Sequence, residues 1–137
     1  MAGSPDGVGN VNPVGVYNVW ADPEAATAVF DAAGAKTMIG WNISRTYAVM
    51  TPPETERLRS CGRLGRFAVD INADVDKFCR DNGLEGMDFP DPVAMAVALD
   101  DSIVTEATEE RLVVGLDGPT RGATLPERRD MSEPPCP

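Results

Sequence analysis

The chain has 137 residues, 42% of them apolar, which is enough for one domain or part of one. Its 22 acidic and 12 basic residues give a formal net charge of −10, which disfavours binding to nucleic-acid backbones and anionic membranes. The sequence contains no His, which excludes a Ser-His-Asp triad, a His-based zinc site and a His general acid.

Among the basic residues Lys is scarce, with only Lys36 and Lys77. Scarce Lys beside abundant Asp is typical of adaptation to high salt; the alternative is an ordinary acidic protein.

No signal peptide is visible, and the longest apolar run, Val93–Leu99, is too short to span a membrane, so we expect a cytoplasmic protein. An odd number of widely spaced cysteines predicts free thiols in a reducing compartment. They are Cys61, Cys79 and Cys136.

The first predicted elements are a loop, a helix and a strand, in that order. Residues 1–20 are interrupted by Gly and Pro and are expected to form loops. Residues 22–24 (Asp-Pro-Glu) predict a helix start, with Asp22 as the N-cap, and Gly34 suits the C-terminal cap. Lys36–Ile43 then predicts a buried strand.

A second helical region begins at residues 51–54 (Thr-Pro-Pro-Glu), which combine a capping box with Pro at the first helical position. We expect helix to continue from there to about Asn82, with a break near Gly62 and a stop at Gly83. Its predicted apolar stripe consists of Phe67, Ile71, Val75 and Phe78.

The last elements begin at Asp91, which together with Pro92 predicts a second Asp-Pro helix start and a helix to about Leu99. Ile103–Thr105 and Arg111–Leu116 are predicted to form a hairpin around the acidic turn between them. From Pro126 onward the sequence is dense in Pro and has no periodicity, which predicts a disordered tail. This order of helices and strands indicates part of an α/β protein.

The best candidate for chemistry lies in residues 9–26, where Asn10 and Asn18 sit on a loop rich in Gly and Pro before the first helix. Side-chain amides donate to and accept from sugar hydroxyls, and loops often carry binding groups. Alternatively, both Asn residues only satisfy turn geometry. Spacing alone leaves both interpretations open.

Residues 9–26 read Gly-Asn-Val-Asn-Pro-Val-Gly-Val-Tyr-Asn-Val-Trp-Ala-Asp-Pro-Glu-Ala-Ala. Without a gap, they closely resemble the pattern Gly-Asn-Val-Thr-Pro-x-Ala-Glu-Phe-Asn-x-x-x-Asp-Pro-Glu-Ala-Ala of the inosine/uridine-preferring nucleoside hydrolase family. Shorter segments resemble the family in the same order: Thr-Met-Ile-Gly-Trp at 37–41, Phe-Pro-Asp-Pro-Val-Ala at 89–94 and Thr-Arg-Gly at 120–122. The resemblance covers residues 1–124 and implies the C-terminal portion of that α/β fold, a mixed sheet with flanking helices, incomplete here. Residues 125–137 are then a divergent tail.

The resemblance implies hydrolysis of the N-glycosidic bond of ribonucleosides to ribose and free base, with an oxocarbenium-like transition state. In this family calcium binds the ribose diols and activates water. Asn10 and Asn18 match the family's ribose-binding amides, and Asp91 matches a calcium-ligating carboxylate. From the residues alone, Asp91 is equally explained as a helix cap.

Three departures from the family pattern bear on activity. Val16 stands where the family has a Glu that contacts ribose, and Pro90 stands where some members have a His. The family's N-terminal Asp-x-Asp-x-x-x-Asp-Asp segment, which supplies the general base and most calcium ligands, has no counterpart. Residues 70–76 are superficially similar, but they fall within a predicted helix whose solvated face would hold Asp70 and Asp74.

We therefore expect a truncated member of the family that holds no catalytic residue, does not retain calcium by itself and is inactive as this fragment. The expected partners are a small-molecule ribonucleoside, a second copy of the chain or a complementing N-terminal segment, and neither nucleic acid nor membrane. Two other interpretations are a non-catalytic remnant or interaction module, and a nucleoside- or sugar-binding protein that uses Asn10 and Asn18.

Overall fold

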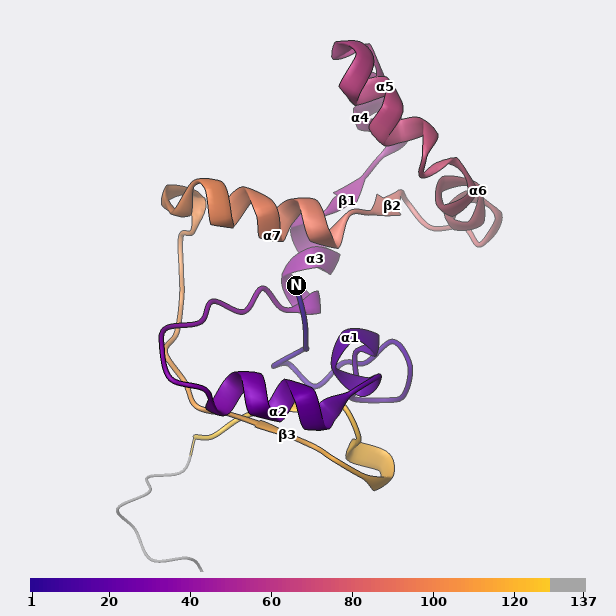
Figure 1. Cartoon of the computed structure of the whole chain (residues 1–137). Helices are drawn as coiled ribbons and strands as arrows, with labels where there is room; N and C mark the ends of the chain where they lie inside the picture. Colours follow the sequence, from indigo (N-terminus) through magenta and orange to yellow (C-terminus); the bar gives the residue numbers. More distant parts are fainter. Residues whose placement is uncertain (129–137) are drawn as a thin grey trace, which may run out of the picture. The chain divides into compact units, whose positions relative to one another are not determined.

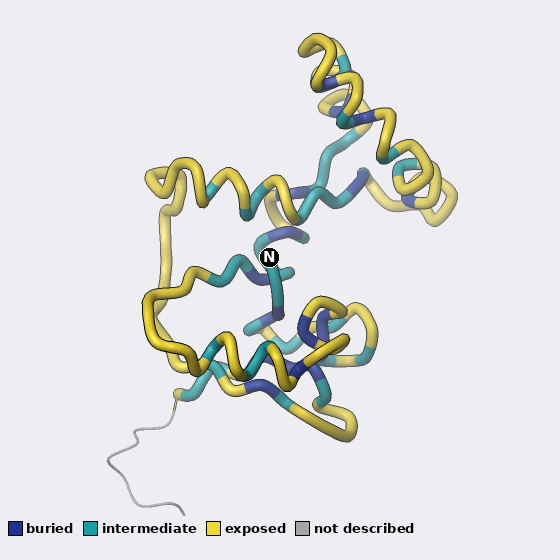
Figure 2. The backbone as a smooth tube through the Cα atoms, viewed as in Figure 1, coloured by how far each residue is buried: buried dark blue, intermediate teal, exposed yellow. Residues whose placement is uncertain are grey.

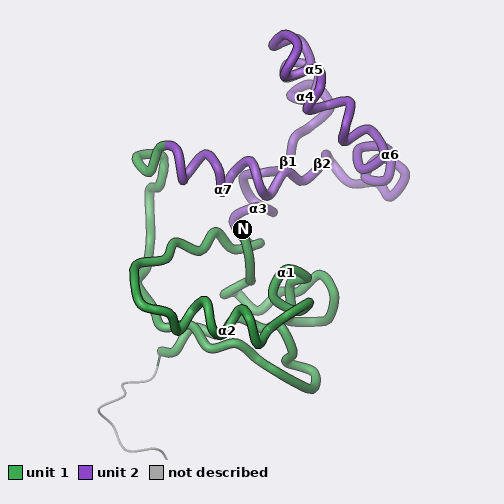
Figure 3. Tube along the Cα trace, in the orientation of Figure 1, with its two compact units in different colours: residues 1–42, 100–137 green, residues 43–99 purple. Residues whose placement is uncertain are grey.

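The computed structural model describes residues 1–128, and the chain divides into two compact units (Figure 3). The first unit contains residues 1–42 together with the chain from Asp100 onward, and the second contains Ile43–Leu99. Both units combine helices with short antiparallel strand pairs, so the fold class is α/β as expected (Figure 1).

The first unit is organised around one helix and one hairpin. It contains α1 (Tyr17–Trp20), α2 (Pro23–Asp31), the 3-10 helices η1 (Asp101–Ile103) and η2 (Gly118–Thr120), and the strands β3 (Leu112–Val114) and β4 (Thr124–Pro126). The helix α2 packs against β3. The predicted start of α2 is confirmed, because the Asp22 carboxylate accepts a hydrogen bond from Ala25 N at 2.9 Å.

The predicted strand at residues 36–43 is wrong. Residues 35–40 have no regular structure, and Trp41–Tyr47 forms a helix, α3. Two backbone hydrogen bonds join this stretch to the N-terminal segment: Ala2 N donates to Ile39 O at 3.2 Å, and Trp41 N donates to Gly3 O at 2.8 Å. The chain enters α3 at Trp41 and does not continue beside the N-terminal segment, so the apolar pattern forms only an extended pairing here.

The predicted hairpin is also wrong in its partners. Leu112 of β3 pairs with Pro126 and Val114 with Thr124, so β3 joins β4 downstream rather than residues 103–105 upstream. Upstream, the Asp100 carboxylate accepts hydrogen bonds from Ser102 N at 3.1 Å and Ser102 Oγ at 2.6 Å. These bonds turn the chain into η1 and lower the pKa of Asp100, with the side-chain bond from Ser102 as the main cause.

The hairpin reaches the start of the predicted tail, since Leu125 and Pro126 belong to β4. Residues 129–137, including Cys136, lie outside the described residues, so the tail stays a prediction. Of the other two cysteines, Cys61 is a free thiol on the surface and Cys79 is free and buried.

The core of the first unit joins the chain's beginning to its end. Figure 2 colours the buried stretches of the backbone dark blue. The buried apolar residues of this unit are Val16, Val19, Val114 and Ala123. Ser4 and Thr124 are buried among them, each 1% exposed, and Ser4 N donates to Thr124 Oγ1 at 2.8 Å. Since a buried amide without a partner would be costly, this bond fixes the N-terminal segment against β4.

The second unit consists mainly of helices. It contains β1 (Val49–Met50), α4 (Pro52–Ser60), α5 (Gly62–Asp70), α6 (Ala73–Asp81), β2 (Met87–Asp88) and α7 (Pro90–Leu99). The strands β1 and β2 pair antiparallel, and Phe89 N extends the pairing by donating to Ala48 O at 2.9 Å. Within residues 1–128, no helix is long and apolar enough to cross a membrane.

The long helix predicted after Thr51 is three helices. The break near Gly62 is confirmed, but a second break after Asp70 was not predicted. There, Asn72 Nδ2 donates to Ala68 O at 2.8 Å, so the side chain competes for a carbonyl at the end of α5. Asp70 ends α5 and pairs with Arg59 at 2.5 Å, and Asp74 is exposed in the first turn of α6.

The predicted apolar stripe of this region is not packed. Its four members are between 49% and 63% exposed, so they do not form the core of the second unit. The buried apolar residues of this unit lie elsewhere, at Ala48, Val69, Cys79 and Met87. Periodicity therefore identified an apolar face correctly but not what covers it.

Acid is expected to weaken the start of α4. The Thr51 hydroxyl and Thr51 N both donate to the Glu54 carboxylate, at 2.6 and 2.8 Å, and these bonds lower the pKa of Glu54 below its ordinary value of 4.5. A group whose pKa is lowered by folding stabilises the fold above its unfolded pKa and loses that effect as the pH falls through the folded pKa.

We therefore expect Glu54→Gln to speed amide exchange in the first turn of α4 at neutral pH, and the difference from wild type to shrink as the pH falls below 4.5 and through the lowered pKa of Glu54. The matched control is Glu56→Gln, whose side chain is 77% exposed and 3.9 Å from Arg59. Equal exchange in the two variants at neutral pH would contradict a capping role for Glu54.

Candidate functional site

The predicted binding loop, residues 9–16, is closed by its own backbone. Gly9 N donates to Pro13 O at 3.0 Å, while Asn10 N and Val11 N both donate to Gly15 O, at 3.0 and 3.3 Å. A loop held in this way presents its side chains from a fixed backbone, as a binding site requires.

Asn12 holds this loop together through side-chain hydrogen bonds, a role that was not predicted from the sequence. Its Oδ1 accepts from Val14 N at 3.0 Å and Gly15 N at 2.6 Å, and its Nδ2 donates to Arg121 O at 2.9 Å. The signal was available, because Asn before Pro is a turn-forming pair whose side chain bonds the backbone two residues on.

The Thr-Arg-Gly segment at 120–122 lies in the connection between β3 and β4 and presses on the loop and on α1. A Cβ placed on Gly15 would lie 2.6 Å from Arg121 O, and one placed on Gly122 would lie 2.6 Å from Trp20 Cα. Arg121 also donates to Leu116 O at 2.8 Å and lies 3.4 Å from the Glu24 carboxylate. The two motifs, distant in sequence, therefore support one another.

Asn10 combines a structural role with an open amide. It is exposed, and its Oδ1 accepts from Tyr17 N at 2.9 Å, which satisfies the start of α1. Its Nδ2 makes no hydrogen bond to any residue in the range 1–128. The turn interpretation therefore accounts for the oxygen of this side chain and leaves the nitrogen for a ligand.

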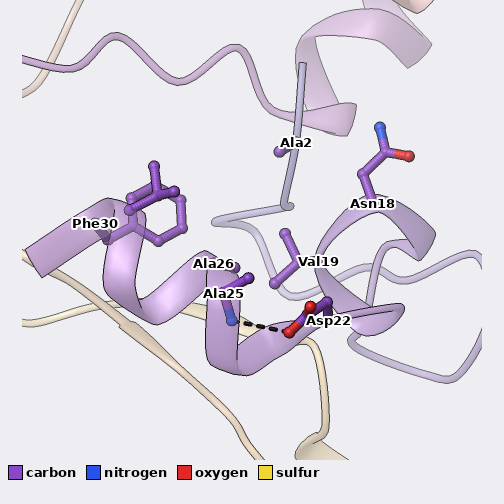
Figure 4. Close-up of a pocket in the computed structure, with 8 residues that line it drawn as sticks. Ala2, Asn18, Val19, Asp22, Ala25, Ala26 and Phe30 are labelled. Atoms are coloured by element: carbon purple, nitrogen blue, oxygen red, sulfur yellow. Dashed lines mark hydrogen bonds between the residues drawn. The ribbon is translucent and has the colours of Figure 1, made fainter.

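Asn18 lies one residue beyond Tyr17, so the structure brings the two predicted amides to the same short helix. It is exposed, and its Nδ2 donates to Met1 O at 3.2 Å. Figure 4 shows Asn18 at the rim of an open groove.

This groove, of about 300 Å³, runs between Ala2 and α2. Two polar side chains line it, Asn18 and Asp22, and the Asp22 carboxylate already caps α2. The remaining lining is apolar and consists of Ala2, Val19, Ala25, Ala26, Val29 and Phe30.

Val16 is a buried residue at the end of the loop, directly before α1. It is 1% exposed, and its carbonyl accepts from Val19 N and Trp20 N, both at 2.9 Å. The side chain therefore packs in the core of the first unit and offers no acceptor to a sugar hydroxyl.

Asp91, the predicted metal ligand, belongs to the second unit. The N-cap interpretation of this residue is wrong, because α7 begins one residue earlier, at Pro90. Asp91 is exposed within the first turn, where a carboxylate is favoured by the positive end of the helix dipole.

The described residues do not fit a calcium ion by themselves. Calcium takes six to eight oxygen ligands. In residues 1–128 no three or more Asp, Glu or Cys side chains gather where they could hold a metal. The acidic stretch 70–76 is no exception, since Asp70 pairs with Arg59 and Asp76 with Arg80.

Asn12→Ala is expected to lower the free energy of unfolding of the first unit by about 2–3 kcal/mol, since it removes three hydrogen bonds worth about 1 kcal/mol each. Urea denaturation followed by Trp fluorescence measures the loss. Asn12→Asp keeps the acceptor and removes the donor, so its loss should be smaller. Equal stability of wild type and Asn12→Ala would show that this side chain does not hold the loop.

Comparison with known proteins gives consistent matches. The family model described as inosine-uridine preferring nucleoside hydrolase matches residues 1–136. The chain is 32% identical over 119 residues to a probable uridine nucleosidase of Arabidopsis thaliana, covering 85% of this chain and 36% of that protein. It is 31% identical over 111 residues to an inosine-uridine preferring nucleoside hydrolase of Crithidia fasciculata, covering 80% of this chain and 34% of that protein.

Among solved structures, a purine-preferring ribonucleoside hydrolase from Gardnerella vaginalis superposes with a TM-score of 0.82 at 31% identity. The superposition covers 98% of this chain and 43% of that one. The chain thus spans between a third and a half of the length of these relatives, and its structure is a partial fold.

Proposed function

The chain belongs to the inosine-uridine preferring nucleoside hydrolase family, and on that premise we propose that it supplies the ribose-binding part of a ribonucleoside hydrolase. The observation that carries the proposal is the hydrogen bond from Tyr17 N to Asn10 Oδ1, which holds Asn10 at the start of α1, the helix that contains Asn18. Amide groups recognise the hydroxyls of ribose, and the Nδ2 of Asn10 is available for this.

In the proposed reaction these amides bind and orient the sugar while the bond between ribose and base breaks. Positive charge develops on the ribose in such a reaction, so a site gains by holding the ring in a fixed position next to negative groups. The chain's own contribution is orientation. We assign it no catalytic acid or base, and no step through a metal.

We further propose that the chain alone releases no ribose. The carboxylate that lines the groove together with Asn18 is that of Asp22, and one of its oxygens caps α2. Val16, buried in the core, supplies no acceptor either. The base and the calcium ligands would come from the part of the family fold that this chain does not contain, with Asp91 as one further ligand.

A ribose-release assay with inosine and uridine tests the proposal. The full chain is assayed alone and with the N-terminal portion of the Crithidia fasciculata relative, ending where the match begins, in calcium and high salt because of the net charge of −10. We expect release only from the mixture, and none from the relative's portion alone. Release by the chain alone would contradict the proposed inactivity, and no release from a mixture that forms a complex would contradict the hydrolase function.

A second candidate is a non-catalytic interaction module. The observation that favours it is the exposed apolar stripe of α5 and α6, in which Phe67 and Phe78 are 60% and 62% exposed. This candidate predicts a complex with no ribose release.

For the cellular location of the chain we propose the cytoplasm, where Cys61 and Cys79 would stay reduced.

A further inference from the structure

The two proposed ribose-binding amides are held in different ways. Asn18 belongs to α1, whereas the exposed Asn10 lies on the loop before it. The Asn10 side chain is attached to α1 through its oxygen, which accepts from Tyr17 N at 2.9 Å. The direction of its Nδ2 therefore depends on where the loop backbone holds Asn10. A residue that fixes this backbone bears on ribose recognition without contacting the sugar.

The side-chain oxygen of Asn12 fixes the loop from inside. It accepts from Val14 N at 3.0 Å and Gly15 N at 2.6 Å. The carbonyl of Gly15 accepts in turn from Asn10 N at 3.0 Å, so two successive hydrogen bonds connect the Asn12 side chain to the backbone of Asn10. The loop is also closely packed, because a Cβ placed on Gly9 would lie 2.1 Å from Asn12 O and 2.5 Å from Gly15 N. Asn10 has little room to move while these bonds hold.

The side-chain nitrogen of Asn12 attaches the loop to a distant part of the chain. It donates to Arg121 O at 2.9 Å, in the connection between β3 and β4. That connection is closed by its own backbone, because Gly122 N donates to Gly115 O at 2.8 Å and Gly115 N donates to Ala123 O at 3.0 Å. Arg121 O is therefore a fixed acceptor outside the loop. Since an amide carries both a donor and an acceptor, Asn12 serves the loop and the connection at once.

We propose that Asn12 is a positioning residue of the ribose site: by joining the loop to Arg121 O, it sets the direction in which Asn10 Nδ2 points. The proposal rests on the proposed function. A hydrogen bond to a hydroxyl weakens steeply when its donor turns away from the acceptor, so Asn12 contributes orientation and makes no contact with the sugar. The family pattern has Thr at this position, so the amide connection belongs to this chain's own sequence.

Asn12→Asp breaks the connection at one end. It keeps an acceptor for Val14 N and Gly15 N and places a carboxylate oxygen opposite Arg121 O, where the donor was. The matched control is Gly118→Ala, which strains the same β3–β4 connection at φ +56° but has no atom within 4 Å of the added Cβ. Both variants disturb this connection, and only Asn12→Asp removes its bond to the loop.

Relaxation of the ¹⁵N side-chain amides, measured on the full chain, reports how firmly Asn10 is held. We expect the order parameter of the Asn10 NH₂ group to fall from about 0.8 to below about 0.6 in Asn12→Asp and to stay unchanged in Gly118→Ala. Asn82, whose Nδ2 donates to Phe78 O at 2.8 Å in the second unit, is the internal reference. An equal order parameter in wild type and Asn12→Asp, or an equal fall in both variants, would overturn the proposal.

A ribose titration of the complex with the N-terminal portion of the Crithidia fasciculata relative gives the second readout. We expect Asn12→Asp to bind ribose at least about fivefold more weakly than wild type, and Gly118→Ala to change the affinity less than about twofold. Far-UV circular dichroism checks folding, and Asn12→Ser, which has no amide, replaces Asn12→Asp if that variant unfolds.

The two readouts separate this inference from the proposed function. Ribose affinity of Asn12→Asp equal to that of wild type would contradict the positioning role alone. A wild-type complex that binds no ribose would contradict the proposed function, and the positioning role with it.

Discussion

Gly122→Ala is expected to destabilise the first unit severely, by about 3 kcal/mol or more, while Gly118→Ala costs about 1 kcal/mol. Both glycines have positive φ, +78° at Gly122 and +56° at Gly118, so both variants strain the backbone. At Gly122 the added Cβ would also lie 2.6 Å from Trp20 Cα, whereas at Gly118 no atom lies within 4 Å.

The difference between the two variants isolates the packing of the 120–122 turn against α1. Because the contact at Gly122 is with backbone, it cannot be relieved by a side-chain rotation. Urea denaturation followed by Trp fluorescence measures both variants. Equal destabilisation by the two substitutions would show that the turn does not press on α1 and that the site loop is held in another way.

The second large effect is a loss of ribose recognition when Asn10 or Asn18 is substituted. Two variants of Asn10 separate its bond to Tyr17 N from its proposed bond to ribose. Asn10→Asp keeps the acceptor for Tyr17 N and removes the amide donor, whereas Asn10→Ala removes both. In the complex with the relative's portion, each variant and Asn18→Ala should lower kcat/KM about tenfold, as expected for one hydrogen bond to a hydroxyl. Combining Asn10→Asp with Asn18→Ala should lower it about 100-fold.

Stability measured in parallel distinguishes recognition from folding. Asn10→Ala should also destabilise the chain by about 1 kcal/mol, because Tyr17 N loses its partner, and Asn10→Asp should not. If Asn10→Asp keeps wild-type kcat/KM, the amide nitrogen does not contact the substrate and the turn interpretation of this residue is sufficient.

Local signals in the sequence predicted part of this structure well. The cap at Asp22 and the capping box at Thr51 depend on residues within three positions of each other, and both are confirmed. For the motif at residues 9–26 the prediction is half right: Asn10 lies on a loop as expected, but Asn18 lies inside α1, a helical turn that the predicted loop over residues 1–20 did not include.

Features that depend on distant partners were predicted poorly. The apolar residues after Lys36 suited a strand, but after two backbone hydrogen bonds with Ala2 and Gly3 the chain enters α3 at Trp41. The partner of β3 is β4, because the Asp100 turn takes residues 101–103 into η1. No pattern in the sequence shows that Val16 is buried or that Arg121 O accepts from Asn12, since both follow from contacts between segments far apart in the chain.

Two-dimensional ¹⁵N NMR of side-chain amides tests the central claim, that Asn10 and Asn18 bind ribose, most directly. The labelled full chain, in complex with the unlabelled portion of the relative, is titrated with ribose. We predict shifts of the Asn10 and Asn18 NH₂ signals, while Asn72 and Asn82, which donate to Ala68 O and Phe78 O at 2.8 Å, stay fixed. If the first pair does not move, or if all four move alike, the assignment of the ribose site to α1 is contradicted.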